Sequence, residues 1–165
     1  MKVLVPRHSR LFPSPEFREE ARLRIANIPK ERFETYVDWF YYIHIDPVQR
    51  WVHAFGMFVG AGFFGAMVAA WGWWSIPFYL IGVFFFYGFG VISHQIYDRG
   101  EAKSEPKYFL LTLWLVISIN LTTVLMTYDA GLRRFVAKYP FAAEAFDLIE
   151  MERSEVLSHV LGRRP

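Results

Sequence analysis

The chain has 165 residues, of which 54% are hydrophobic and 19% aromatic, a composition too apolar for an ordinary soluble domain of this size. Its formal net charge of +2 argues against a nucleic-acid-binding protein, and the lack of cysteine excludes disulfides, thiolate metal sites and iron–sulfur clusters. A bound metal ion would therefore need His, Asp or Glu ligands.

The N-terminal part is predicted to lie outside the membrane core. Residues 1–13 are basic and lack the apolar stretch of a signal peptide, so we expect a loosely ordered tail. Ser14-Pro15-Glu16 provides the hydroxyl, proline and acid that typically start a helix, which should end near Ala26. A second helix is expected over residues 30–45. Its aromatic cluster at 39–42 suits a membrane interface, so residues 14–45 are predicted to form two interfacial helices.

Three apolar segments follow, each long enough to cross about 30 Å of hydrocarbon. The first, after the helix cap Asp46-Pro47, runs to Ala70 and contains one strongly ionisable group beyond residue 51, His53. A tryptophan-rich turn at 71–74 leads to the second, residues 78–97, which contains His94. A charged loop, residues 98–107, precedes the third, residues 108–127, whose polar side chains should face the other helices.

The fold class predicted is an all-α integral membrane protein: one domain, residues 1–165, with a three-span helical bundle over 47–127 and amphipathic interfacial helices at both ends. Residues 129–140 are expected to be a polar connection and 141–161 an amphipathic helix. Residues 1–50 and 98–107 carry 12 of the 18 Lys and Arg residues, which predicts that this face is cytoplasmic, in a bacterial inner membrane or the endoplasmic reticulum. The lipid bilayer is the expected partner, and whether the chain also binds other membrane subunits stays open.

Two histidine-bearing helix faces are predicted to meet at one end of the bundle. Polar residues at 46, 49, 50 and 53 follow helical spacing along one face. His53 and His94 are equidistant from the turn at 73–74, so in an antiparallel hairpin they lie at the same depth. His44 is expected at the same depth, because only a short break at residues 46–47 separates it from the first apolar segment. Asp98 follows His94 by one helical turn. We therefore take His44, His53, His94 and Asp98 as candidate metal ligands.

Less specific interpretations have to be weighed for each residue. A single histidine near a helix end is more often structural, and we assign His8 and His159 that way. Ionisable residues inside a membrane usually face the bundle interior and mark function, which favours a site at His53 and His94. Arg50 is either a substrate-binding group or an anchor that extends to the membrane surface. Arg50 and Tyr87, which lies on the helix face of His94, are the candidate catalytic residues.

A resemblance sharpens these expectations. His44-x-x-Pro47-x-x-Arg50-x-x-His53-x-x-Gly56, followed by His94-x-x-x-Asp98, resembles the Mpo-type family of membrane 2-hydroxy fatty acid dioxygenases over about residues 36–127. Gln49 stands where that family usually has Asn, Ser93 where it has Gly, and Asp98 where it has Glu. The resemblance implies an Fe(II) enzyme that uses O₂ to shorten 2-hydroxy fatty acids by one carbon.

The residues are compatible with that chemistry but leave alternatives open. A set of histidines and a carboxylate with open positions suits non-haem iron. A 2-hydroxy acid would chelate the iron, Arg50 would pair with its carboxylate, and its chain would lie in an apolar groove beside Gly56, Gly60 and Gly90. Two histidines at one depth also suit a b-type haem or a chlorophyll-like pigment in an electron-transfer or pigment-complex subunit. A structural accessory subunit without a site is the third possibility.

Overall fold

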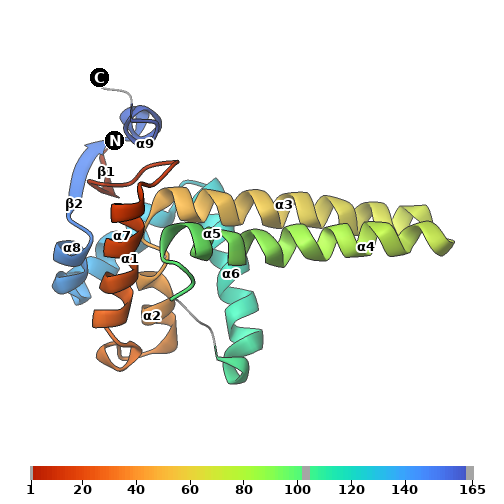
Figure 1. Cartoon of the computed structure of the whole chain (residues 1–165), viewed down its shortest axis with the longest axis horizontal. Coiled ribbons are helices and arrows are strands. Elements are labelled where there is room, and N and C mark those ends of the chain that lie inside the picture. Colours follow the sequence, from red (N-terminus) through yellow and green to blue (C-terminus); the bar gives the residue numbers. More distant parts are fainter. Residues whose placement is uncertain (1, 102–104, 163–165) are drawn as a thin grey trace.

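The computed structural model describes residues 2–101 and 105–162 and shows a body from which one long helical hairpin extends (Figure 1). The hairpin comprises residues 47–97, and the body comprises the other described residues. The helices and strands are β1 Lys2–Pro6, α1 Pro15–Asn27, α2 Tyr36–Tyr42, α3 Pro47–Ala70, α4 Ser75–Val83, α5 Phe89–Tyr97, α6 Phe109–Val124, α7 Tyr128–Lys138, α8 Pro140–Ala145, β2 Leu148–Glu152 and α9 Val156–Val160. Short 3-10 turns cover Lys30–Arg32, Gly72–Trp74, Pro106–Tyr108 and Arg153–Glu155, and a π-helical turn covers Phe84–Gly88.

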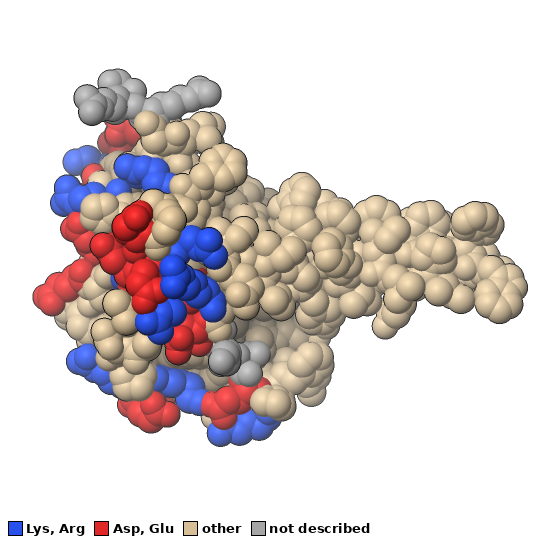
Figure 2. Space-filling model, in the orientation of Figure 1, with Lys and Arg blue, Asp and Glu red and all other residues tan. Residues whose placement is uncertain are grey.

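The hairpin is the most apolar part of the molecule. Its first arm, α3, begins at Pro47 after the Asp46 side chain accepts a hydrogen bond from Val48 N at 2.8 Å. Its 24 residues give a length of about 36 Å, enough to cross the hydrocarbon of a bilayer. Residues 51–97 contain no Lys, Arg, Asp or Glu. Figure 2 shows the consequence, because the charged side chains gather on the body and the hairpin surface is free of them.

Glycines let the two arms of the hairpin pack closely. A Cβ atom on Gly60 would come within 2.8 Å of the carbonyl oxygen of Gly82, and one on Gly56 would collide with Phe89. The apolar groove expected beside Gly56 and Gly60 is therefore filled by the second arm. That expectation was wrong because the same small residues that would open a groove also draw a neighbouring helix into it.

The third apolar segment is arranged differently from the expected bundle. Three helical segments among the described residues are long and apolar enough to cross a membrane: Pro47–Ala70, Gly72–Tyr97 and Pro106–Val124. In Figure 1, however, α6 lies across the base of the hairpin and not alongside it. The buried Asn120 donates a hydrogen bond from its amide to Met57 Sδ at this crossing, 3.5 Å away. The α6 helix itself has 16 residues and is about 24 Å long, which is short for a span.

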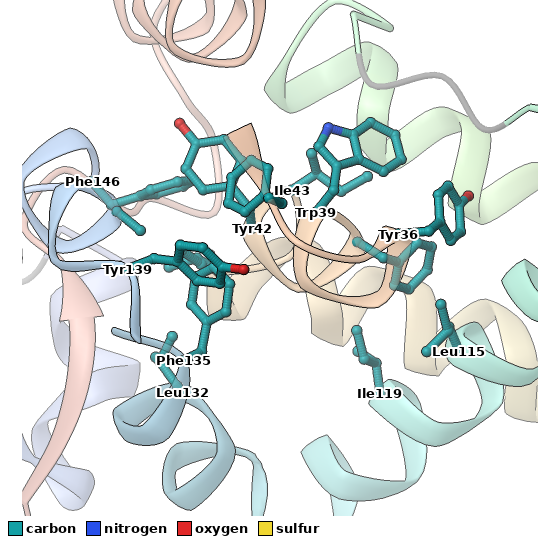
Figure 3. Packing of buried hydrophobic residues seen from close by; sticks show 14 of the residues in the cluster. Tyr36, Trp39, Tyr42, Ile43, Leu115, Ile119, Leu132, Phe135, Tyr139 and Phe146 are labelled. Carbon is teal, nitrogen blue, oxygen red and sulfur yellow. The ribbon is translucent and has the colours of Figure 1, made fainter. Parts of the chain in front are cut away.

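Aromatic side chains form the core of the body (Figure 3). Trp39, Phe40 and Tyr42 of α2 are at most 6% exposed and pack against residues of α6, α7 and α8. The Tyr42 ring meets Phe146 edge to face with centroids 5.2 Å apart. The expectation that this cluster settles in the membrane interface was therefore wrong. A run of aromatic residues has the same composition in either place, and its burial depends on segments about 100 residues later.

The two ends of the chain also differ from expectation. The expected loose tail contains β1, which pairs antiparallel with β2, and its residue Val5 is 2% exposed. The expected helix over 141–161 is instead α8, β2 and α9, interrupted at Asp147, whose φ is 45°. The expected polar connection contains α7. A five-residue strand has too few residues to show a clear period, and its partner lies almost the whole chain away.

The transverse position of α6 generates a prediction about topology. We expect the hairpin alone to cross the bilayer, with α6 along its surface, so that both ends of the chain lie on one side. Because the chain has no cysteine, single cysteines at Ser14, Trp73 and Glu144 can be labelled in sealed membrane vesicles. Cysteines at positions 14 and 144 should react from one side and the cysteine at position 73 from the other. Reaction of position 144 from the same side as position 73 would restore the three-span arrangement.

Candidate metal centre

Three histidines from three different segments meet where the hairpin joins the body. His44 follows α2, His53 lies near the start of α3, and His94 lies near the end of α5. Their ring centroids are 5.0, 5.1 and 5.4 Å apart, each pair edge to face. One ring nitrogen from each lies within 4.8 Å of the others, which is a grouping that suits a metal ion. The prediction that His44, His53 and His94 lie close together is thus confirmed.

His44 is fixed through its Nδ1 atom. Nδ1 lies 2.8 Å from the Phe40 carbonyl oxygen, to which it donates its proton, and the imidazole packs on the Phe40 ring. This hydrogen bond leaves the lone pair on Nε2, which is buried and has no partner among the described residues. Burial, and after it the neighbouring His53 and His94, hold the pKa of His44 well below its usual range. The ring is therefore neutral at pH 7, the form that binds metals.

His94 is fixed by Asp98. Its Nδ1 atom donates to Asp98 Oδ2 at 2.7 Å, and the side-chain amide of Gln49 lies 2.9 Å from the same nitrogen. The second carboxylate oxygen of Asp98 accepts a hydrogen bond from Gly100 N at 3.0 Å. Both oxygens of the predicted metal ligand Asp98 are thus occupied, and the structure places it as the group that orients His94. A carboxylate behind a metal-bound imidazole is a common arrangement, and it leaves Nε2 free for the metal.

His53 owes its position to a glycine. Its Nε2 atom is buried and, like that of His44, has no hydrogen-bond partner among the described residues. Gly90 on the facing arm makes room for the ring, since a Cβ atom there would lie 3.0 Å from His53 Cε1 and 3.3 Å from Nδ1. The open volume expected beside Gly90 is therefore occupied by an imidazole and not by substrate.

The donor set passes a simple test of fit to a metal. Unpaired polar atoms in a protein interior are costly, about 1–3 kcal/mol each, and two occur here side by side. A metal bound at about 2.1 Å to each nitrogen would hold the three nitrogens about 3–3.5 Å apart. The three candidate nitrogens lie within 4.8 Å of one another, so they would have to approach one another by up to about 1–2 Å to reach that geometry. His44, His53 and His94 would be the ligands, and three protein ligands leave positions open for others.

Arg50 contacts the main chain that carries His44. Its Nη1 atom donates to the carbonyl oxygens of His44, at 2.9 Å, and Ile45, and its guanidinium lies 3.6 Å from the centroid of the Tyr128 ring. The side chain is 7% exposed, so it is not an anchor at the membrane surface. The Tyr128 hydroxyl donates to the same His44 oxygen at 3.2 Å. In this structure Arg50 therefore positions a candidate ligand.

Tyr87 lies apart from the cluster. Its side chain is 45% exposed on the hairpin, and its ring packs edge to face on Phe86. The catalytic role expected for Tyr87 is thus at odds with its position. Tyr87 belongs to the π-helical turn, which changes the helical register between Tyr87 and His94, so the two side chains do not share one helix face. Regular spacing from His94 could not anticipate that change. Sequence reasoning in turn missed Tyr128, since residues 128–138 gave no expectation of a helix.

Comparison with known proteins adds no relative: no family model, no curated protein and no solved structure matches the chain. The resemblance described above rests on the spacing of a few residues.

A glycine substitution tests the packing of His53. We predict that Gly90→Ala lowers metal affinity at least about tenfold, because the new methyl group displaces the His53 ring from the cluster. Gly65→Ala is the matched control, since a Cβ at Gly65 meets nothing within 4 Å and alanine favours the helix. Competition with a chelator would measure both. Equal affinities in the two variants would show that Gly90 does not set the position of His53.

A second substitution tests the role of Arg50. Lysine keeps the charge but cannot donate to two carbonyl oxygens while stacking on Tyr128. We predict that Arg50→Lys weakens metal binding about tenfold or more, the loss expected from about 1.5–3 kcal/mol of charged hydrogen bonds. The exposed Arg134, changed to lysine, serves as the control. Unchanged metal affinity in Arg50→Lys, with the protein folded, would remove the positioning role.

Proposed function

We propose that the protein is a membrane-embedded, non-haem Fe(II) dioxygenase that acts on 2-hydroxy fatty acids and shortens them by one carbon. The observation that supports this most is the cluster of His44, His53 and His94, in which two buried Nε2 atoms have no protein partner. The spacing of these histidines, with Pro47, Arg50 and Gly56, also matches the dioxygenase pattern at most of its fixed positions, while Asp98 stands where that pattern has Glu.

The donor set supports iron chemistry of this kind. Imidazole ligands suit iron, copper, nickel and zinc, and three of them leave open positions for a second ligand and for O₂. A 2-hydroxy carboxylate is a natural chelator because its hydroxyl and carboxylate oxygens reach one metal together. When bound, Fe(II) would be the group that reacts with O₂.

The surrounding residues have separate tasks in this proposal. Asp98 holds the Nδ1 proton of His94 and keeps Nε2 directed at the metal. Arg50 and Tyr128 fix the carbonyl group of His44, and Phe40 fixes its ring. The burial of Asp98, Arg50, Tyr128, Phe40 and His44 would keep bulk water away from the reaction.

The haem alternative fits this geometry less well. Axial imidazoles on a haem approach the iron from opposite faces of a wide macrocycle. Here three rings face one point at centroid distances of 5.0 to 5.4 Å, and the Phe40 ring packs against His44 at 4.2 Å. A macrocycle between any two of these rings would displace the third. No observation in the described residues favours a haem, a pigment or a purely structural role over a metal centre.

The location follows from the same proposal. The hairpin would cross the membrane, and the charged body would lie on the cytoplasmic side of a bacterial inner membrane or the endoplasmic reticulum. The histidines sit at the junction of hairpin and body. A fatty acid in the bilayer would present its polar head at this level while its chain stays in lipid.

Product analysis tests the proposal. The purified protein, loaded with Fe(II) without oxygen and then given O₂, should consume one O₂ for each 2-hydroxyhexadecanoic acid and release pentadecanoic acid, CO₂ and water. Mass spectrometry would detect the pentadecanoic acid. His53→Ala should lose both bound iron and product. His159→Ala should keep both, because its ring contacts Pro6 and Arg10 and not the cluster. A Soret band in the purified protein, or iron binding without turnover, would contradict the assigned reaction.

A further inference from the structure

One face of α1 covers the polar groups that surround His94. Four of its residues line a small cavity of about 20 Å³: Phe17, Ala21, Arg24 and Ile25. Their spacing along the helix places them on one face. The same cavity is lined by Asp46, Gln49 and Asp98, and the last two contact Nδ1 of His94. Because α1 also packs against α5 (Figure 1), it forms a cover over this side of the candidate metal centre.

This cover is held mainly by contacts at the protein surface. Of the 13 residues of α1, all of which the structure describes, Ala21 alone is buried. Glu19 pairs with Arg99 at 2.6 Å and Arg22 with Glu101 at 3.7 Å, and these four side chains are 33% to 46% exposed. Exposed ion pairs contribute little to stability, and salt screens them. Local opening of α1 should therefore cost less free energy than opening of α2, whose aromatic side chains form the core of the body.

The closed helix also places a positive charge at the cavity. Arg24 lines it, and the guanidinium of Arg24 lies 4.5 Å from the centroid of the Phe146 ring. Asp46 and Asp98, which line the cavity from outside α1, are 5% and 2% exposed. Carboxyl oxygen atoms attract a metal cation, whereas a guanidinium repels it. Lifting α1 would therefore remove the repelling charge and expose the attracting groups in one movement.

The closed structure leaves a metal ion little access to the three histidines. His44 and His53 are 1% and 8% exposed, and the side chain of His94 is 15% exposed. His94, the most exposed of the three, lies beside α1, where Arg18 Nη2 donates to the carbonyl oxygen of Gln95 at 2.9 Å. A buried metal site needs an entry path. The weakly held helix α1 is placed to provide one on the His94 side.

We propose that α1 is a lid that opens to admit a divalent metal ion from the aqueous side, past Asp46 and Asp98, and then closes over the loaded centre. The inference rests on the metal centre of the proposed function but not on the reaction assigned to it. A lid of this kind sets the rates at which the metal enters and leaves and does not alter the contacts of the bound metal. Locking it should therefore slow uptake and release equally and leave the equilibrium affinity unchanged.

Zinc exchange through a locked lid tests the proposal. In Arg22→Cys/Glu101→Cys, a short bis-methanethiosulfonate crosslinker would join α1 to the segment after α5, and the chain has no other cysteine. In phosphatidylcholine nanodiscs, the crosslinked protein should release Zn²⁺ to a chelating dye, and take it up, at least tenfold more slowly, and reducing the crosslink should restore both rates. Glu34→Cys/Lys138→Cys, crosslinked across an ion pair that does not involve α1, is the matched control. Equal exchange rates in the two crosslinked proteins would overturn the lid.

A charge variant tests what holds the lid closed. Glu19→Gln removes the ion pairs of α1 with Arg99 and within the helix with Arg22. We expect Zn²⁺ release about two- to fivefold faster, with the equilibrium affinity unchanged, because exposed ion pairs are weak. High salt should speed release from the wild type in the same direction. Glu144→Gln, at an exposed position with no ion pair among the described residues, is the control. Unchanged release from Glu19→Gln would overturn the role of these ion pairs in holding α1.

Hydrogen exchange separates this inference from the proposed function, because it needs no metal. In the metal-free protein the backbone amides of α1 should exchange at least tenfold faster than those of α2, and the crosslink between positions 22 and 101 should slow them. Exchange of α1 as slow as that of α2 would overturn the lid even in a protein that binds metal. Zinc exchange that responds to the crosslink would support the lid even if no 2-hydroxy acid is turned over. A protein that binds no metal would overturn both proposals.

Discussion

Three imidazoles, those of His44, His53 and His94, pack against one another where the hairpin joins the body. The Nε2 atoms of His44 and His53 are buried and have no hydrogen-bond partner among the described residues, an arrangement that costs about 1–3 kcal/mol for each atom left unpaired. A metal ion bound there would convert that cost into binding free energy, and it would link α2, α3 and α5 to one another. A purely structural histidine would normally place each ring nitrogen against a protein or water partner.

The remainder of the fold holds these three rings in place from outside. The Asp98 carboxylate accepts a hydrogen bond from the His94 ring, and the Phe40 carbonyl group accepts one from the His44 ring. Gly90, which has no side chain, leaves room for the His53 ring. The aromatic core of the body carries α2, and α7 adds Tyr128 at the His44 carbonyl oxygen. The hairpin supplies the other two histidines at its base. The apolar arms and the charged body thus meet at the cluster.

The parts of this arrangement that sequence could predict are those with a strong local signal. The hairpin could be predicted from 47 successive residues without Lys, Arg, Asp or Glu and from the turn at their centre. Because His53 and His94 are equally far from that turn, their common depth could be predicted as well. The role of Asp98 could not be separated from direct ligation, because one helical turn from a histidine suits a ligand and a hydrogen-bond partner equally. The partners of Arg50 depend on α7 and on the path of residues 44–46, which no periodic pattern describes. The direction of α6 was likewise hidden, since apolar length does not distinguish a crossing helix from one that lies on a surface.

X-ray absorption at the metal edge of the purified protein would show whether the three histidines bind a metal ion. We expect about one metal ion per chain, with about three nitrogen ligands at about 2.0–2.2 Å, the outer-shell scattering typical of imidazole, and loss of this signal in His53→Ala. A protein that binds no metal, a metal with only oxygen ligands, or the rigid scattering pattern of a porphyrin would contradict it.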